Sequence, residues 1–166
     1  AVHLIFANLE AAFKDGSDIH ARRRMLMASY YAGCAFTKSY VGYVHAVAHS
    51  LGGEYGVPHG LANSVLLPFV LEAYGTAIHG KLHRLAIAAG LACRHTPRDE
   101  AARRFIEAIK DMKTRFGISN TIPEIQKADI PKLACYADKE ANPLYPVPVL
   151  MDAKELEQFY YKVSSF

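Results

Sequence analysis

Signals that begin and end helices recur along this sequence, whereas signals for β-strands are poor. No run of β-branched residues alternates with polar residues between turn signals. Asp18 can cap a helix that runs towards Ala35, and the leucine- and alanine-rich residues 81–89 stop at Gly90. The pattern therefore predicts an all-α fold of about seven to nine helices.

A further helix is predicted to begin at Pro97 and to pack one face against a core. Thr96 is a candidate N-cap, and proline is favoured at the first helical position that follows it. Gly117 is a candidate C′ residue, because glycine adopts the left-handed backbone that ends many helices. The apolar face of this helix consists of Phe105, Ile109, Met112 and Phe116.

Two pairs of residues match the capping box, in which a short polar side chain and a later glutamate satisfy free backbone amides. The pairs are Thr121 with Glu124 and Asp152 with Glu155, and each predicts the start of a helix. The prolines in residues 142–148 predict an extended connector between two helices. No internal repeat or low-complexity tract interrupts the chain, so residues 1–166 are predicted to form one domain.

Charge and cysteine content narrow the class of protein. The formal net charge of +3 is too small to indicate binding to nucleic acid or to an anionic membrane. The longest apolar stretch, residues 61–71, is interrupted by Asn63 and Pro68 and is too short to span a bilayer. The three cysteines lack a Cys-x-x-Cys pair, which favours buried thiols and a reducing, cytoplasmic setting. They are Cys34, Cys93 and Cys135.

The start of the chain indicates a fragment of a longer protein. It opens directly into apolar sequence, without an initiator methionine and without the basic segment of a signal peptide. A length of 166 residues also leaves little room for a second domain that binds a nucleotide.

A cluster of histidines is the most informative part of the sequence. His45 and His49 are four residues apart, so on a helix they project from one face. His59 follows a glycine-rich turn, and a new helix is predicted to begin there, so the three imidazoles are predicted to converge. Neutral imidazole is a ligand for Zn²⁺, Fe²⁺ and Ni²⁺. A solvated or capping pair is the alternative, and no glutamate follows His45 as the metalloprotease pattern His-Glu-x-x-His requires.

The remaining histidines are predicted to be exposed and without a functional role. They are His3, His20, His79, His83 and His95.

Three short runs stand at fixed spacing within residues 42–68: His-Ala-Val-Ala-His-Ser-Leu-Gly-Gly, Pro-His-Gly-Leu-Ala-Asn and Leu-Leu-Pro. This segment resembles the iron-containing (group III) alcohol dehydrogenases. Residues 32–36 resemble the helix before the motif, and residues 142–151 resemble the C-terminal end of the butanol- and propanediol-dehydrogenase-like members. The resemblance covers essentially all 166 residues. It implies the helical C-terminal domain of the iron-containing alcohol dehydrogenase and dehydroquinate synthase-like fold.

The resemblance implies a site for a divalent metal, Fe²⁺ foremost and Zn²⁺ as the alternative. Two of the family's histidine ligands match His45 and His59, and a catalytic histidine beside the metal and the nicotinamide matches His49. Spacing alone would instead make His45 and His49 the co-ligands. The family's other ligands lie in an Asp-x-x-x-His helix, which has no counterpart in residues 1–44.

The implied activity of the full-length parent is the interconversion of a primary alcohol and an aldehyde with NAD or NADP. His49 would contact the substrate or pass its proton towards solvent. Phe36, Tyr43 and Tyr55 are candidates to line the alcohol pocket, with ordinary core packing as the alternative. The N-terminal nucleotide-binding domain is not in this chain, so the chain alone is expected to be inactive and to bind metal weakly.

Two alternatives remain open at this point. A glycerol dehydrogenase or dehydroquinate synthase-like relative keeps the fold and changes the reaction. A non-catalytic helical interaction module would act through an exposed face. A chain separated from its partner domain would also expose apolar surface, which favours a homodimer.

Overall fold

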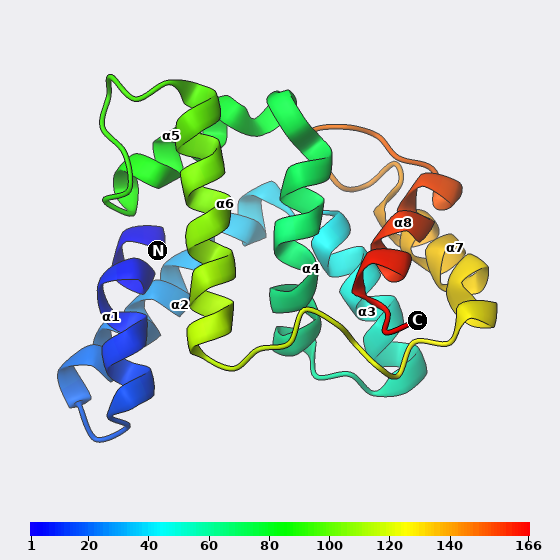
Figure 1. Cartoon of the computed structure of the whole chain (residues 1–166), viewed down its shortest axis with the longest axis horizontal. Coiled ribbons are helices and arrows are strands. Elements are labelled where there is room, and N and C mark those ends of the chain that lie inside the picture. The colour runs from blue at the N-terminus through cyan, green and yellow to red at the C-terminus, as the bar shows by residue number, and fades with distance from the viewer. The chain divides into compact units, whose positions relative to one another are not determined.

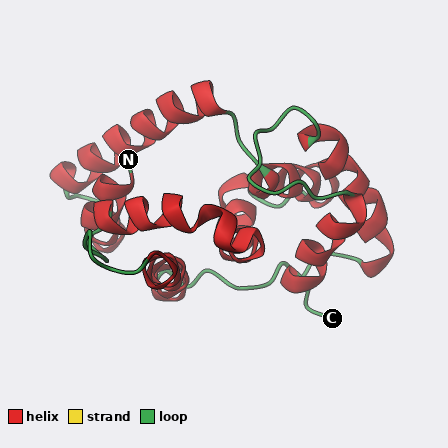
Figure 2. Cartoon of the chain, turned by 90° about the horizontal axis from the view of Figure 1, so that it is seen from above, coloured by secondary structure: helices red, strands yellow, loops and turns green.

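The chain folds into helices without any β-strand (Figure 1, Figure 2). The computed structural model describes residues 1–166, and its eight α-helices and two short 3₁₀ helices confirm the all-α prediction. The elements are α1 (Val2–Lys14), α2 (Ile19–Ser39), α3 (Tyr43–Tyr55), α4 (His59–Tyr74), η1 (Gly75–Ile78), α5 (His79–Ala88), α6 (Arg98–Arg115), η2 (Lys127–Asp129), α7 (Ile130–Ala141) and α8 (Ala153–Val163).

These helices pack as two compact units. The first unit consists of Ala1–Tyr40 with Ile78–Ala108, and the second consists of Val41–Ala77 with Ile109–Phe166. In the first unit, α1 packs against α2 and α5. All three histidines of the predicted cluster belong to the second unit.

The second unit is built around a core of four helices. Helix α3 packs against α4 and α7, and α8 also packs against α4 and α7. Each helix contributes fully buried apolar side chains, among them Leu51, Leu66, Leu133 and Phe159. Burial of apolar surface is the main term that stabilises such a core. Helix α3 and the start of α4 are therefore held in place by close packing against the other two helices.

Most of the predicted helix signals are confirmed. Asp18 accepts a hydrogen bond from the amide of Ala21 at 2.9 Å at the start of α2. Asp152 and Glu155 form the predicted capping box at the start of α8. Gly117 follows α6 with a φ of 68°, as expected of a C′ residue.

One predicted helix start is shifted and one is wrong. Helix α6 begins at Arg98, one residue after the predicted Pro97, and Thr96 is not its cap, because the Thr96 hydroxyl accepts a hydrogen bond from the amide of Cys93 at 3.0 Å. No helix begins at Thr121. The amide of Ile122 instead donates to the carbonyl of Val163 at 2.7 Å, which ties this segment to the end of α8.

The connector between α7 and α8 is turned at its start rather than extended as predicted. The amide of Tyr145 donates to the carbonyl of Ala141 at 2.7 Å, which continues the hydrogen bonding of the last turn of α7. The Asn142–Pro143 peptide bond within this turn is cis.

The prediction of buried cysteines is also wrong. Cys34 and Cys93 are exposed, and Cys135 is half-buried. Cys34 lies on α2, whose buried residues are Ala21 and Ala28. The small apolar neighbours of Cys34 therefore did not mark a face that packs against the core.

Two of the other histidines are less exposed than predicted. His79 and His83 are half-buried, because they share one stripe of α5 with the buried Leu82 and Ala86. The exposure predicted for His3, His20 and His95 is confirmed.

One segment, His59–Ala88, is apolar and long enough to cross a membrane by length and composition, with a mean hydropathy of 1.4. A core helix of a folded domain passes the same test, and residues of α4 such as Val65 and Leu66 are fully buried in the second unit.

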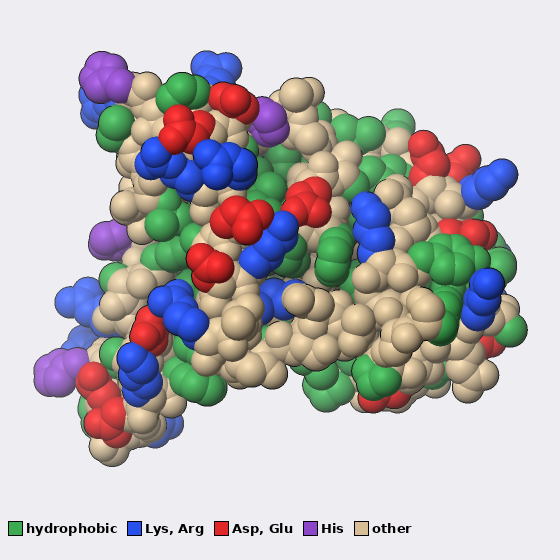
Figure 3. Space-filling view, in the orientation of Figure 1, with side chains coloured by type: hydrophobic (Ala, Val, Ile, Leu, Met, Phe, Trp, Pro, Cys, Tyr) green, Lys and Arg blue, Asp and Glu red, His purple; other side chains and the backbone are tan.

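On the face drawn in Figure 3, basic and acidic side chains are mixed, which agrees with the small net charge of +3.

Candidate metal centre

A sharp turn between α3 and α4 brings the histidines together. Helix α3 ends at Tyr55 and is followed by Gly56, whose φ of 69° lies in the left-handed region and whose amide donates to the carbonyl of Gly52 at 3.0 Å. Glycine adopts this conformation without strain. Pro58 directly precedes His59, the first residue of α4, and its fixed φ restricts how the chain enters that helix.

The predicted convergence of three imidazoles is confirmed. His45 and His49 lie one turn apart on α3, and their ring centroids are 5.8 Å apart. The ring of His59 lies 5.4 Å from that of His45 and 5.2 Å from that of His49. The rings of His49 and His59 are stacked at an angle of 24°.

His45 is the most enclosed member of the cluster. Burial lowers the pKa of its imidazole below the usual 6.5, and the neighbouring His59 and His49 lower this pKa further. The carboxylate of Glu140 acts in the opposite direction. At neutral pH the ring of His45 is therefore uncharged, which is the form of imidazole that binds metal ions.

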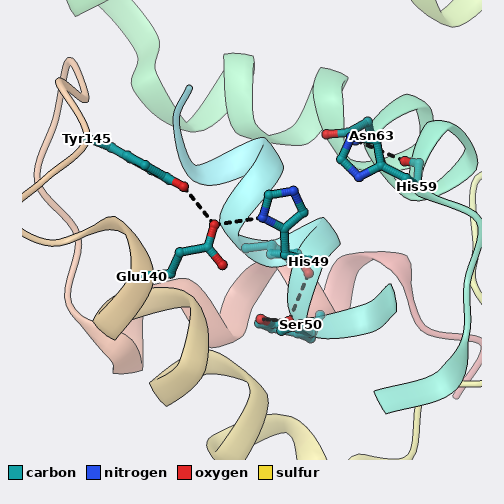
Figure 4. A network of polar contacts seen from close by, with 8 residues as sticks. His49, Ser50, His59, Asn63, Glu140 and Tyr145 are labelled. Carbon is teal, nitrogen blue, oxygen red and sulfur yellow. Dashed lines mark hydrogen bonds and ion pairs between the residues drawn. The ribbon is translucent and has the colours of Figure 1, made fainter. Parts of the chain in front are cut away.

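The ring of His59 is held by Asn63, one turn further along α4 (Figure 4). The side-chain nitrogen of Asn63 donates to Nε2 of His59 at 3.0 Å and to the His59 carbonyl at 2.9 Å. The lone pair of Nε2 of His59 therefore accepts the hydrogen bond from Asn63. The Oδ1 atom of Asn63 is buried and has no hydrogen-bond partner, which is uncommon for a buried polar atom.

His49 contacts a residue from a different helix. Its Nδ1 atom lies 2.7 Å from Oε1 of Glu140, which is on α7 (Figure 4). The hydroxyl of Tyr145, in the connector after α7, donates to the same carboxylate oxygen at 2.8 Å. Burial raises the pKa of Tyr145 to about 12, together with its hydrogen bond to Glu140, so this phenol remains a donor at neutral pH.

Sequence reasoning did not identify Glu140 or Tyr145. The sequence separation between His49 and Glu140 is 91 residues, and no local pattern relates them. The pair becomes visible only when the packing of α7 against α3 is known.

A buried hydrogen-bond network anchors α3 directly behind His49. The hydroxyl of Ser50 donates to that of Tyr160 on α8 at 2.7 Å. The Tyr160 hydroxyl in turn donates to the carbonyl of Leu133 on α7 at 3.0 Å. Ser50 therefore ties the helix that carries the histidines to α8 and, through Tyr160, to α7.

Two of the aromatic residues considered for a substrate pocket use their hydroxyls in the fold. Tyr43 is 0% exposed, and its hydroxyl contacts Asn142 and Met151. The Tyr55 hydroxyl donates to Asp129 at 2.8 Å. These contacts agree with the core-packing alternative for both tyrosines. Phe36 belongs to the first unit and is 51% exposed.

The chemistry of these donors fits part of a site for a divalent metal. Burial favours the uncharged form of His45, and His59 supplies a second imidazole whose neighbour Asn63 has an orphaned Oδ1 atom. The three rings are not arranged as a ligand set, since no group of three or more His, Cys, Asp or Glu side chains is placed to hold a metal ion. Two imidazoles fall short of the four or more ligands that Zn²⁺ or Fe²⁺ takes in proteins.

Comparison with known proteins places these observations in context. A family model described as the C-terminal part of the Fe-containing alcohol dehydrogenase family matches residues 1–163. The 1,3-propanediol dehydrogenase of Klebsiella pneumoniae is 39% identical over 144 residues, or 86% of this chain and 37% of that protein. The 1,3-propanediol dehydrogenase of Citrobacter freundii is 36% identical over 162 residues, or 96% of this chain and 42% of that protein. The chain thus spans about two-fifths of the length of these relatives.

Solved structures agree with the sequence comparison. A 1,3-propanediol oxidoreductase matches with a TM-score of 0.90 and 34% identity, covering 98% of this chain and 43% of that chain. An alcohol dehydrogenase from Oenococcus oeni matches with a TM-score of 0.89 and 30% identity, also covering 98% of this chain and 43% of the other. These matches confirm the predicted helical-domain fold.

Proposed function

The chain belongs to the Fe-containing alcohol dehydrogenase family and corresponds to its C-terminal part, and from this premise we propose that it is the metal-binding, catalytic domain of an alcohol dehydrogenase. The activity is the interconversion of a primary alcohol and an aldehyde with NAD or NADP. The observation that carries the proposal is the convergence of His45, His49 and His59, whose ring centroids lie 5.2–5.8 Å apart.

His45 and His59 would hold the metal. Imidazole nitrogens suit Fe²⁺, the ion we favour, and they suit Zn²⁺ as the alternative. A metal on Nε2 of His59 would replace the hydrogen bond from Asn63. When bound, such an ion supplies Lewis-acid chemistry, which increases the acidity of an alcohol hydroxyl. The spacing of His45 and His49 alone would make these two residues the co-ligands. We assign His59 instead, because the resemblance to the iron-containing alcohol dehydrogenases matches His59 with a metal ligand and His49 with the catalytic histidine.

His49 is the proposed catalytic residue. Its side chain is 42% exposed, so the ring can face both a substrate at the cluster and the surrounding water. An imidazole in that position can take the hydroxyl proton of the alcohol and release it to solvent. The buried hydrogen bond between Ser50 and Tyr160 fixes this turn of α3, which keeps the ring of His49 near the other two histidines.

The complete site requires groups that this chain does not supply. We propose that the chain acts with an N-terminal domain that binds NAD or NADP and contributes the remaining metal ligands, an Asp and a His. The relatives support this proposal, because this chain accounts for 37–42% of their length. We place the enzyme in the cytoplasm and expect the chain alone to form a homodimer through the apolar surface that the absent domain would cover.

The rival reactions have less support. Relatives that match include 1,3-propanediol dehydrogenases and an alcohol dehydrogenase, which favours alcohol oxidation over the reactions of glycerol dehydrogenase or dehydroquinate synthase. A non-catalytic interaction module would have no use for three converging imidazoles.

Titration with Co²⁺ tests the metal assignment in the 166-residue chain. Weak binding is expected, and it should be lost in His45→Ala and in His59→Ala. His95→Ala, which changes an exposed histidine of the first unit, is the matched control and should bind Co²⁺ like the parent. Equal binding by all four proteins would show that the cluster does not hold the metal.

Turnover tests the reaction itself. The chain alone should not reduce butyraldehyde with NADH or NADPH. The complete polypeptide, with its nucleotide-binding domain and metal, should do so. Robust activity of the 166-residue chain, or no activity of the metal-loaded complete protein with any primary alcohol or aldehyde, would contradict the proposal.

A further inference from the structure

Glu140 and Tyr145 form a hydrogen-bonded pair on one side of the candidate catalytic histidine. A carboxylate oxygen only accepts hydrogen bonds, so the short contact between Oε1 of Glu140 and Nδ1 of His49, 2.7 Å, requires a hydrogen on Nδ1. A neutral imidazole carries one ring hydrogen. Nε2 of His49 is then left with a free lone pair on the other edge of the ring.

We propose that Glu140 is a positioning residue that holds His49 in the Nδ1–H tautomer with Nε2 free to accept a proton, and that Tyr145 fixes the Glu140 carboxylate. The role of Nε2 as the proton acceptor in catalysis rests on the proposed function. The contacts that set the tautomer are independent of any metal or substrate.

The arrangement of the two donors supports this role. Tyr145 and His49 both donate to the same oxygen of Glu140, at 2.8 and 2.7 Å, so that oxygen is held from two sides (Figure 4). A phenol is protonated at neutral pH, and burial together with the hydrogen bond to Glu140 raises the pKa of Tyr145 further, to about 12. The backbone of Tyr145 is fixed as well, because its amide donates a hydrogen bond to the carbonyl of Ala141 at 2.7 Å.

Stability does not explain the contact. The side chains of His49 and Glu140 are 42% and 33% exposed, and ion pairs at such partly exposed positions contribute little to folding. Orientation is a different matter, because a partner on Nδ1 decides which nitrogen of a histidine remains available. The pair therefore acts on the chemistry of the ring rather than on the fold.

NMR of the 166-residue chain at about pH 8.5, where imidazoles are neutral, tests the assignment directly. Long-range ¹H–¹⁵N correlation identifies the ring nitrogen that carries the hydrogen. His49 is expected in the Nδ1–H form, and the exposed His20 and His95 are the internal reference for unrestrained rings. His49 in the Nε2–H form would overturn the proposal.

Variants separate a positioning role from a structural one. Glu140→Ala should return His49 to the tautomer mixture of the reference rings, and Glu140→Gln should restore part of the Nδ1–H form, because its amide oxygen still accepts. Glu54→Ala is the matched control. It removes a partly exposed carboxylate that lies on α3 and pairs with Lys132 of α7 at 2.7 Å, and it should leave His49 unchanged. An unchanged tautomer in Glu140→Ala would overturn the proposal.

Kinetics of the complete enzyme provide the second readout. Glu140→Ala should lower kcat by about 10–100-fold while KM for the alcohol changes little, since the residue touches His49 and not the substrate. Tyr145→Phe should lower kcat less. An unchanged kcat in Glu140→Ala would refute the role in catalysis. If the NMR result holds and the parent enzyme turns over no alcohol, the failure belongs to the proposed function and not to the contact.

Discussion

Replacing Tyr43 with phenylalanine removes one buried hydroxyl and tests how the connector before α8 is held. The Tyr43 side chain is 0% exposed. Its hydroxyl accepts the amide of Met151 at 2.9 Å, and it donates towards Oδ1 of Asn142 at 2.9 Å and the carbonyl of Met151 at 3.1 Å. A phenylalanine ring fills nearly the same volume, so Tyr43→Phe keeps the packing and removes these polar contacts.

The expected loss follows from what remains without a partner. Met151 is 7% exposed, so its amide has little access to water once the hydroxyl is gone. An orphaned buried amide costs about 1–3 kcal/mol, and a lost hydrogen bond about 0.5–1.5 kcal/mol. The side-chain nitrogen of Asn142 still donates to the carbonyl of Met151 at 2.9 Å, so the connector stays partly attached. A decrease of about 2–4 kcal/mol in the free energy of unfolding is therefore expected.

Urea unfolding followed by circular dichroism measures this decrease as a shift of the midpoint at constant slope. Hydrogen exchange of the Met151 amide should become faster in Tyr43→Phe. Tyr30→Phe is the control, because Tyr30 is 69% exposed, and it should change stability by less than about 0.5 kcal/mol. An equally small change in Tyr43→Phe, with Met151 still protected, would refute the reasoning from the orphaned amide.

Three further predictions concern the fold around the site. Gly56→Ala should destabilise the chain by about 1–2 kcal/mol, because the φ of Gly56 is 69°. Gly53→Ala, inside α3 with open space around it, should be neutral or stabilising. Equal effects of the two substitutions in urea unfolding would contradict this reasoning. Burial raises the pKa of Tyr74 from 10.0 to about 12, so the folded state retains a proton that the unfolded state loses. Stability should therefore fall as pH rises from 10 to 12, and urea midpoints should show a shallower fall for Tyr74→Phe. Asp152→Ala breaks the capping box of α8 and should lower the unfolding free energy by about 1 kcal/mol, a loss that thermal unfolding would detect.

The features that the sequence predicted are those that depend on near neighbours. Asp18 and the pair of Asp152 with Glu155 cap helices because their partners lie within one turn. The spacing of His45 and His49 defines one face of a helix wherever that helix packs. The left-handed Gly56 follows from a glycine-rich turn, and it determines where α4 begins.

The predictions that failed depend on contacts between distant segments. Thr121 with Glu124 has the right composition for a helix start, but the hydrogen bond from Ile122 to Val163 keeps this segment out of a helix. Cys34 has small apolar neighbours, yet its helix turns that position outwards. Composition describes which residues could be buried, whereas the partner helix decides which of them are.

The same distinction applies to the candidate site and explains why its most specific contact could not be foreseen. The histidine pattern is local, so it identifies the rings but not what holds them. The orientation of His49 is set by Glu140, which is held by Tyr145 in the connector after α7. The same connector is attached to the start of α3 through Tyr43 and Met151. The connector thus contacts Glu140 through Tyr145, and it contacts α3 through Met151. Loosening the connector should therefore disturb the orientation of the His49 imidazole, although the connector does not contact that ring.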